Sequence, residues 1–112
     1  MSVTGGDDDL RWEAFVTAML AVGGPADERR SRYGDKRALF IEGREIAHLE
    51  APGVIDLRIT RRGWAQARDD YGEDPAVRHD PARRDWIELR LSSPADLDRL
   101  TRLLVITAAE NA

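Results

Sequence analysis

The sequence predicts an α+β fold, in which an antiparallel sheet of about four strands carries the N- and C-terminal helices on one face. Apolar residues recur with helical spacing near both ends of the chain, and they alternate with polar residues in its middle, as they do in strands. Short turn signals between the alternating segments favour antiparallel hairpins. With 112 residues, the chain is expected to form one domain over residues 9–112, after a flexible N-terminal segment 1–8.

The first predicted helix runs from about Asp9 to Val22. The aspartates at 7–9 suit its N-terminus, because carboxylates cap the free backbone N–H groups there. Its apolar face consists of Trp12, Phe15, Val16, Met19 and Leu20. Gly23-Gly24-Pro25 ends the helix. Residues 26–36 are polar and rich in Arg, and we expect a loop there with a short edge strand near Ser31–Tyr33.

Four segments are predicted to be strands. Arg37–Ile41 and Glu45–Glu50 form a hairpin around a type II′ turn at Gly43-Arg44, because glycine suits the first central position of that turn. Ala51-Pro52-Gly53 turns the chain into the third strand, Val54–Ile59. The fourth strand is Trp86–Leu91, where the alternation returns.

Thr60 is a suitable N-cap for a short helix that reaches about Asp70. Residues 71–85 contain one glycine and two prolines and are expected to form a long irregular loop, a kind of segment that often carries function. Ser93 then caps the final helix, with Pro94 as its first residue. Because Leu103–Ile106 makes this helix apolar on more than one side, it is expected to be buried or to pair with a second copy in a homodimer.

The turn positions set the strand register and therefore the two faces of the sheet. They place His48 opposite Asp56. The face under the helices is expected to consist of Ala38, Phe40, Ala47, Leu49, Ile55, Leu57, Ile59, Ile87, Leu89 and Leu91. The opposite face is expected to consist of Leu39, Ile41, Ile46, His48, Asp56, Arg58, Trp86, Glu88 and Arg90.

This second face mixes polar and apolar side chains, whereas an ordinary solvent-facing sheet surface is nearly all polar. Exposed apolar area often marks an interaction surface. The sequence therefore predicts a module that binds a small ligand or a protein, or a second copy of the chain, through Leu39, Ile41, Ile46, Arg58, Trp86, Glu88 and Arg90. The alternative is that the loop 71–85 or a terminal segment folds over this face.

His48 and Asp56 support a second hypothesis, a small enzyme in which the carboxylate orients an imidazole that acts as an acid or base. His79, in the loop, is the third catalytic candidate. Two histidines with Asp56 or Asp80 would make a 2-His-1-carboxylate set, but their spacing carries no signature, so no metal site is predicted. No nucleophile, phosphate-binding loop or identifiable cofactor accompanies them, and the cofactor is unknown.

Composition excludes several classes of protein. The chain has no cysteine, so disulfides, thiol nucleophiles and cysteine-based zinc sites are excluded. A net charge of −4 makes nucleic acid a poor partner, although Arg61-Arg62 and Arg83-Arg84 are local basic pairs. No apolar run suits a membrane span and the N-terminus does not resemble a signal peptide, so no membrane partner and a cytoplasmic location are expected.

Several motifs resemble the luciferase-like domain family, a small bacterial and fungal domain largely of unknown function. They are Gly43-Arg44-Glu45-Ile46-Ala47-His48-Leu49, a Pro-Gly turn before Val54–Ile59, His79, the strand Trp86–Leu91 and Ser93-Pro94-Ala95-Asp96-Leu97. The resemblance covers about Tyr33 to Ala109. It implies that His48 and His79 match family histidines, whereas Glu50 stands where members often carry another. The oxygen-dependent light reaction that the family name suggests is not expected, since no flavin or luciferin site is visible.

Overall fold

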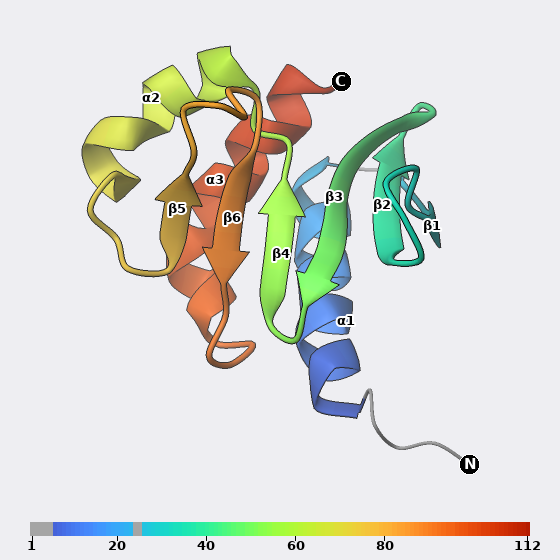
Figure 1. Cartoon of the computed structure of the whole chain (residues 1–112). Helices are drawn as coiled ribbons and strands as arrows, with labels where there is room; N and C mark the ends of the chain where they lie inside the picture. The colour runs from blue at the N-terminus through green and yellow to red at the C-terminus, as the bar shows by residue number, and fades with distance from the viewer. Residues whose placement is uncertain (1–5, 24–25) are drawn as a thin grey trace.

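The computed structural model describes residues 6–23 and 26–112. Its helices are α1 (Gly6–Gly23), α2 (Arg61–Tyr71) and α3 (Asp96–Glu110). Its strands are β1 (Asp27–Arg30), β2 (Arg37–Ile41), β3 (Arg44–Ala51), β4 (Val54–Leu57), β5 (Val77–His79) and β6 (Ile87–Arg90). The strands form one antiparallel sheet in the order β1-β2-β3-β4-β6-β5. Helices α1 and α3 lie side by side behind this sheet, and its other face, the outer face, is turned toward the viewer in Figure 1.

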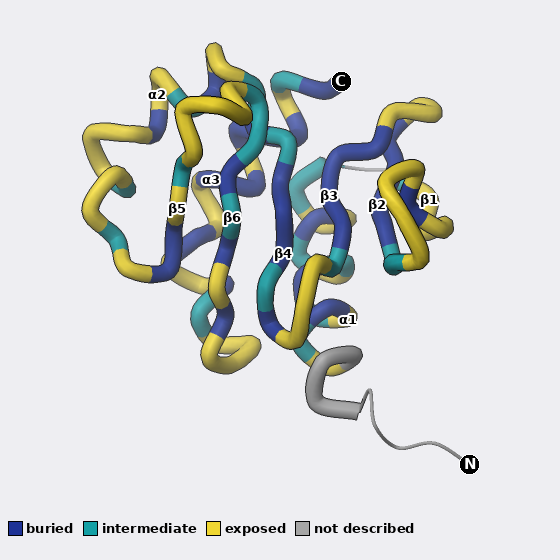
Figure 2. The backbone as a smooth tube through the Cα atoms, viewed as in Figure 1, coloured by how far each residue is buried: buried dark blue, intermediate teal, exposed yellow. Residues whose placement is uncertain are grey.

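The core lies between the sheet and these two helices, and the strands at the centre of the sheet are its most buried part (Figure 2). Helix α1 contributes Trp12, Phe15 and Met19, and α3 contributes Leu100 and Leu103, all of them shielded from solvent. The helical spacing of the sequence thus turns one stripe of each helix toward the sheet. The α+β class and the antiparallel sheet with terminal helices on one face are confirmed.

The sheet has six strands rather than about four. The additional strands are β1 and β5, which form its two edges. Strand β1 reads Asp-Glu-Arg-Arg and is exposed throughout, so it has no alternating pattern that a sequence reading can detect. The edge strand expected near Ser31–Tyr33 is therefore wrong in position. Strand β5 has only three residues and interrupts the segment 71–85, which is not a continuous irregular loop.

The turn between β2 and β3 differs from the predicted one by one residue. Ile41 pairs with Arg44, so the central residues are Glu42 and Gly43, at φ 49° and 80°. Positive φ at both central positions is the type I′ geometry, which matches the twist of the two strands. The predicted type II′ turn at Gly43-Arg44 is wrong, and the slip exchanges the two faces of β2.

As a result, Leu39 and Ile41 belong to the core. Ile46 also belongs to the core, because β3 has an extra residue in its pairing with β2 at this position. The prediction that these three residues lie on the outer face is wrong. Ala38, which pairs with His48, and Phe40, which pairs with Glu45, were expected on the core face but lie on the outer one. Phe40 is nevertheless buried, because the guanidinium groups of Arg29 and Arg32 lie over its ring.

The register of the central strands is as predicted. Ala47 pairs with Leu57, His48 with Asp56 and Leu49 with Ile55. Strand β6 continues the pattern, since Asp56 pairs with Glu88. Here the core face is apolar on every strand, and such a face fixes the register because a slip by one residue would bury the polar set.

Helix α2 begins after Thr60, whose hydroxyl oxygen accepts a hydrogen bond from the Gly63 N–H, as the sequence predicts. Helix α3 begins at Asp96, and its carboxylate accepts hydrogen bonds from the N–H groups of Ser92 and Ser93. The predicted cap by the Ser93 side chain with Pro94 as the first helical residue is wrong.

Most of the apolar surface of α3 is covered by the chain itself. Leu103, Leu104 and Ile106 are buried, whereas Val105 is 47% exposed. The apolar run is therefore explained by packing within one chain, and the homodimer remains a prediction. The flexible segment expected at 1–8 lies outside the described residues up to position 5, and Gly6 already belongs to α1. Within the described ranges, no helix is long and apolar enough to cross a membrane.

Candidate functional site

A β-bulge places two polar residues of β3 together on the outer face. Leu39 pairs with Ala47 and Phe40 with Glu45, so Ile46 is the extra residue between them. Residues three apart on a regular strand point to opposite faces, but the bulge turns both Glu45 and His48 outward. Glu45 Oε2 lies 3.0 Å from His48 Nδ1, and both side chains are buried.

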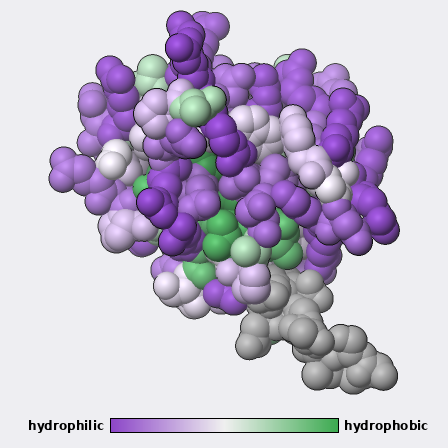
Figure 3. Space-filling view, in the orientation of Figure 1, coloured by the Kyte–Doolittle hydropathy of each residue, from purple (hydrophilic) through white to green (hydrophobic). Residues whose placement is uncertain are grey.

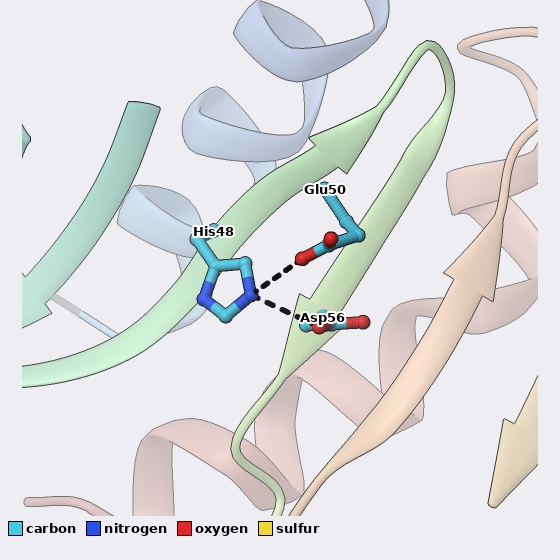
Figure 4. Close-up of side chains that lie close together, drawn as sticks. All are labelled: His48, Glu50 and Asp56. Carbon is cyan, nitrogen blue, oxygen red and sulfur yellow. Dashed lines mark hydrogen bonds and ion pairs between the residues drawn. The ribbon is translucent and has the colours of Figure 1, made fainter. Parts of the chain in front are cut away.

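On its other side, the imidazole of His48 faces two carboxylates (Figure 4). His48 Nε2 lies 2.9 Å from Asp56 Oδ2 and 3.2 Å from Glu50 Oε1. Asp56 arrives from β4 through the predicted pairing. Glu50 follows His48 by two residues, and a second register shift leaves it without a paired residue on β4. Two carboxylates, one from β3 and one from β4, therefore converge on one ring nitrogen.

Both ring nitrogens of His48 face carboxylate oxygens, which only accept hydrogen bonds. A ring that donates from both nitrogens is a charged imidazolium. Burial on its own lowers the pKa of His48, but the hydrogen bond and charge of Asp56 and the hydrogen bond of Glu45 outweigh it, so the pKa is raised. In the described structure, the ring is thus suited to the charged form.

Asp56 is almost fully buried, and its two carboxylate oxygens differ in their hydrogen bonds. Its Oδ2 accepts hydrogen bonds from His48 and from Arg83 Nη2, at 2.9 and 3.0 Å. Burial on its own raises the pKa of Asp56, but these two cationic partners outweigh it, and the pKa is lowered. Its other oxygen, Oδ1, is buried and has no hydrogen-bond partner among the described residues. An unpartnered buried carboxylate oxygen is costly, so it calls for an explanation.

Aromatic side chains surround the ring of His48. The ring centroids of Trp86 and Tyr33 lie 5.4 and 5.7 Å from that of His48, and the two aromatic rings meet edge to face. Tyr33 is 64% exposed. The guanidinium of Arg83 lies over the Trp86 ring, 5.8 Å from its centroid. These groups form the wall of a pocket above the buried carboxylates.

We call this cavity the outer pocket; its volume is about 770 Å³. It is lined by Tyr33, Lys36, His48, Glu50, Asp56, Ala82, Arg83, Arg84, Asp85, Trp86 and Glu88. Its side chains carry charges of both signs, and Figure 3 shows that this side of the molecule is largely hydrophilic. A concave site that combines an aromatic wall with convergent polar groups has the usual features of a small-molecule site.

Two loops build the walls of the outer pocket. The loop between β1 and β2 is tied to β3, since Glu45 accepts hydrogen bonds from the Ser31 hydroxyl and from the Arg32 N–H, at 2.6 and 2.7 Å. In the same loop, Lys36 Nζ lies 2.6 Å from Glu50 Oε1. The loop between β5 and β6 supplies Arg83, which is bonded to Asp56. The alternative in which the segment 71–85 folds over the outer face agrees with the contact of Arg83, whereas the loop between β1 and β2 was not expected there.

The structure separates the predicted catalytic residues. His48 and Asp56 are in contact, but His79 pairs with Ile87 on β6 and stacks on Trp64, with ring centroids 5.2 Å apart. Its Nε2 lies 3.4 Å from the carbonyl oxygen of Arg84. His79 is not among the residues that line the outer pocket. The contacts that the structure shows for His79 therefore do not join it to His48.

The predicted ligand-binding residues are also divided. Trp86 and Glu88 line the outer pocket. Arg58 lies outside this lining and bonds Asn111 on the C-terminal side of α3, while Arg90 pairs with Glu88. Leu39, Ile41 and Ile46 are in the core, as described above.

The sequence reading missed Glu45, Glu50, Tyr33 and Lys36. Glu50 was detectable, because residues two apart on a strand share a face and Glu50 follows His48 at that distance. Glu45 was not, because regular alternation places it on the opposite face and only the bulge brings it to His48. Tyr33 and Lys36 depend on the path of a loop that has no periodic signal.

Three comparisons with known proteins give no match. No family model matches the sequence. No curated protein matches it. No solved structure matches it either.

Proposed function

We propose that this chain is a small-ligand-binding module whose ligand occupies the outer pocket. The observation that carries the proposal is the pocket of about 770 Å³ over Asp56, a lining residue whose Oδ1 has no hydrogen-bond partner in the part of the chain that the structure describes. Since Oδ1 is closed off from solvent, a ligand reaches it only when a side chain over the Asp56 carboxylate moves, and a hydrogen bond donated there would then remove the cost of leaving it unpaired. The volume suits a small organic molecule.

The lining indicates the chemistry of the ligand. Lys36 and Arg84 offer positive charge, and Glu50 and Glu88 offer negative charge, around the aromatic wall of Trp86. A small zwitterion with a flat ring fits this arrangement, because its ring can stack on the indole while its two charged groups find opposite partners. The case for a protein partner is weaker, since it depended on Ile41 and Ile46 being exposed, and both are buried.

Catalysis with His48 as a general base oriented by Asp56 fits the geometry less well than binding does. A general base needs a free lone pair, and both nitrogens of His48 face carboxylates. Its raised pKa favours the charged form, which has no lone pair to offer. The luciferase-like resemblance, the homodimer and the cytoplasmic location remain predictions.

The experiment combines native mass spectrometry of the gently purified chain with an NMR screen of aromatic amino acids and related zwitterions. We expect a bound small molecule, or amide shifts that cluster on the loops 31–36 and 80–86. Trp86→Ala and Arg83→Gln should weaken binding, whereas Arg62→Gln, which removes an exposed arginine outside the pocket lining, should not. Binding that is indifferent to Trp86 and Arg83, or shifts confined to other surfaces, would contradict the proposal.

A further inference from the structure

We propose that the floor of the outer pocket binds one divalent transition-metal ion, through Nε2 of His48 and the carboxylates of Glu50 and Asp56. The inference adds to the proposed function and rests on it, because the ion and the ligand would share the outer pocket. The ion would lie in the same pocket and would hold an oxygen or nitrogen atom of the ligand.

The three side chains already converge as metal ligands do. One ligand atom from each of His48, Glu50 and Asp56 lies within 4.8 Å of the others. The distances from Nε2 to the two carboxylate oxygens are 2.9 and 3.2 Å. Ligand atoms that bind one zinc ion at about 2.0–2.2 Å are themselves roughly 3–3.5 Å apart. Small side-chain movements therefore suffice to place an ion between them.

Glu45 supplies the outer support that metal-binding histidines have. Such a histidine usually donates its second ring N–H to a carboxylate, which fixes the tautomer and the ring orientation. Here Nδ1 of His48 lies 3.0 Å from Glu45 Oε2, and Glu45 is itself held by the Ser31 hydroxyl and the Arg32 N–H. The bulge in β3 thus directs Nε2, and not Nδ1, toward Glu50 and Asp56.

A second, independent observation is the unpartnered oxygen of Asp56. The side chain is only 3% exposed, and within the described ranges its Oδ1 has no hydrogen-bond partner. A cation that this carboxylate binds through both oxygens would satisfy the atom, and the two buried acidic side chains, Glu45 and Asp56, gain more from a nearby divalent ion than exposed ones would.

Two cationic side chains of the pocket bond the carboxylate oxygens that would coordinate the ion. Arg83 bonds Asp56, and Lys36 bonds Glu50. The Arg83 side chain is 46% exposed and comes from a loop, so it can withdraw to solvent. His48 must also release the proton on Nε2, which passes to water when the ion binds, while the Nδ1–H to Glu45 stays.

The ligand set indicates the class of metal. An imidazole favours zinc and its neighbours over magnesium or calcium, which prefer an all-oxygen shell. Three protein ligands leave a fourth position of a zinc ion open to the pocket, as in zinc sites that bind a further molecule. We therefore use Zn²⁺ as the probe, with Mg²⁺ for comparison.

The experiment titrates Zn²⁺ into the full chain after chelation and follows the imidazole ¹⁵N signals by NMR. The chain has only two histidines, so each ring is resolved and His79 is an internal control. We expect one ion per chain at micromolar Zn²⁺, a shift of His48 Nε2 with Nδ1 still protonated, and no response to Mg²⁺. Glu45→Gln should weaken binding about 10- to 100-fold.

Glu50→Gln tests the ligand set directly, because Glu50 is partly exposed and we expect its loss to leave the fold intact. It should weaken Zn²⁺ binding at least as much as Glu45→Gln does, whereas Glu73→Gln, an exposed control outside the pocket, should not. No change at His48 up to millimolar Zn²⁺, a response of His79 alone, or unaltered affinity of Glu50→Gln would overturn the inference.

The two proposals fail separately. If zwitterions bind in the presence of chelator and depend on Trp86, while Zn²⁺ does not bind, the metal inference falls and the ligand-binding module stands. If Zn²⁺ binds as described but no zwitterion binds in its presence or absence, the metal site stands and the proposed ligand falls.

Discussion

Glu45 and His48 are three residues apart on one strand, yet their side chains meet at 3.0 Å on the same face of the sheet. Only the bulge at Ile46 makes this contact possible. Bulges are common beside functional sites because they redirect a side chain. Here the redirected carboxylate sets the orientation and the charge of the imidazole at the floor of the outer pocket.

The first prediction concerns this contact. In the metal-free protein, Glu45→Gln should lower the pKa of His48, because the hydrogen bond to Glu45 is one of the interactions that raise it. The variant should also lower the free energy of unfolding by about 1–3 kcal/mol, since a buried donor loses a charged acceptor. NMR titration of the two histidines measures the first effect and His79 serves as the reference; an unchanged His48 titration would contradict the role assigned to Glu45.

The second prediction concerns the pH dependence of stability without metal. The pKa of His48 is raised, so its contribution is complete below the ordinary value of 6.5 and is lost as pH rises through the folded value. The pKa of Asp56 is lowered, so its contribution is complete above 3.8 and is lost as pH falls through the folded value. Together they contribute most between 3.8 and 6.5.

Denaturant unfolding at a series of pH values, with chelator present, measures this effect. The ring of His48 also faces Glu45 and Glu50, and Lys36 lies close enough to oppose its charge, so the profile reports the whole cluster. His48→Gln should remove the loss of stability on the alkaline side. A variant that keeps the wild-type profile above neutral pH would show that another group is responsible.

The central part of the fold could be predicted from the sequence, and the part around the pocket could not. The pairing of His48 with Asp56 follows from apolar alternation on β3 and β4, where burial of one face determines the register. The error in the predicted register of β2 has a different cause. Gly43 suits either a type I′ or a type II′ turn, depending on its position, and the residues on both sides of β2 are apolar enough to be buried either way.

The other parts of the pocket that the sequence did not predict depend on side chains from loops. Arg83 bonds Asp56 although the two residues are 27 positions apart in the chain, and Lys36 bonds Glu50 across 14 positions. Neither contact has a local pattern, because side chains in loops are placed by tertiary packing. The same limit applies to β1, whose four exposed charged residues resemble a loop in sequence but pair with β2 along its edge.

The third prediction tests the corrected face of Ile46. Ile46 is fully shielded and packs in the core, so Ile46→Ala should lower the free energy of unfolding by about 2–5 kcal/mol. Val105→Ala, a truncation of the half-exposed residue on α3, is the control and should change it by about 0.5 kcal/mol or less. Similar small effects for both variants would contradict the core position of Ile46 and support the outer face for it.

The last prediction concerns Gly63, where α2 approaches α3 and the end of β4. A Cβ added there would lie 2.9 Å from Ile106 Cγ2, 3.0 Å from Ile59 Cγ1 and 3.1 Å from Glu110 Cγ, all closer than side chains normally pack. Alanine is favoured over glycine in a helix by about 1 kcal/mol, so without this crowding Gly63→Ala would stabilise the protein. Crowding in a packed interface costs about 1–3 kcal/mol, and we therefore expect a net loss.

Ala65→Gly calibrates the helical preference, because Ala65 is exposed on the same helix. It should destabilise the protein by about 1 kcal/mol through propensity alone. If Gly63→Ala raised the unfolding free energy by the amount that Ala65→Gly lowers it, the close packing of α2 against α3 would be wrong. A loss in both variants, measured by denaturant unfolding, supports glycine at position 63 as the residue that lets the two helices meet.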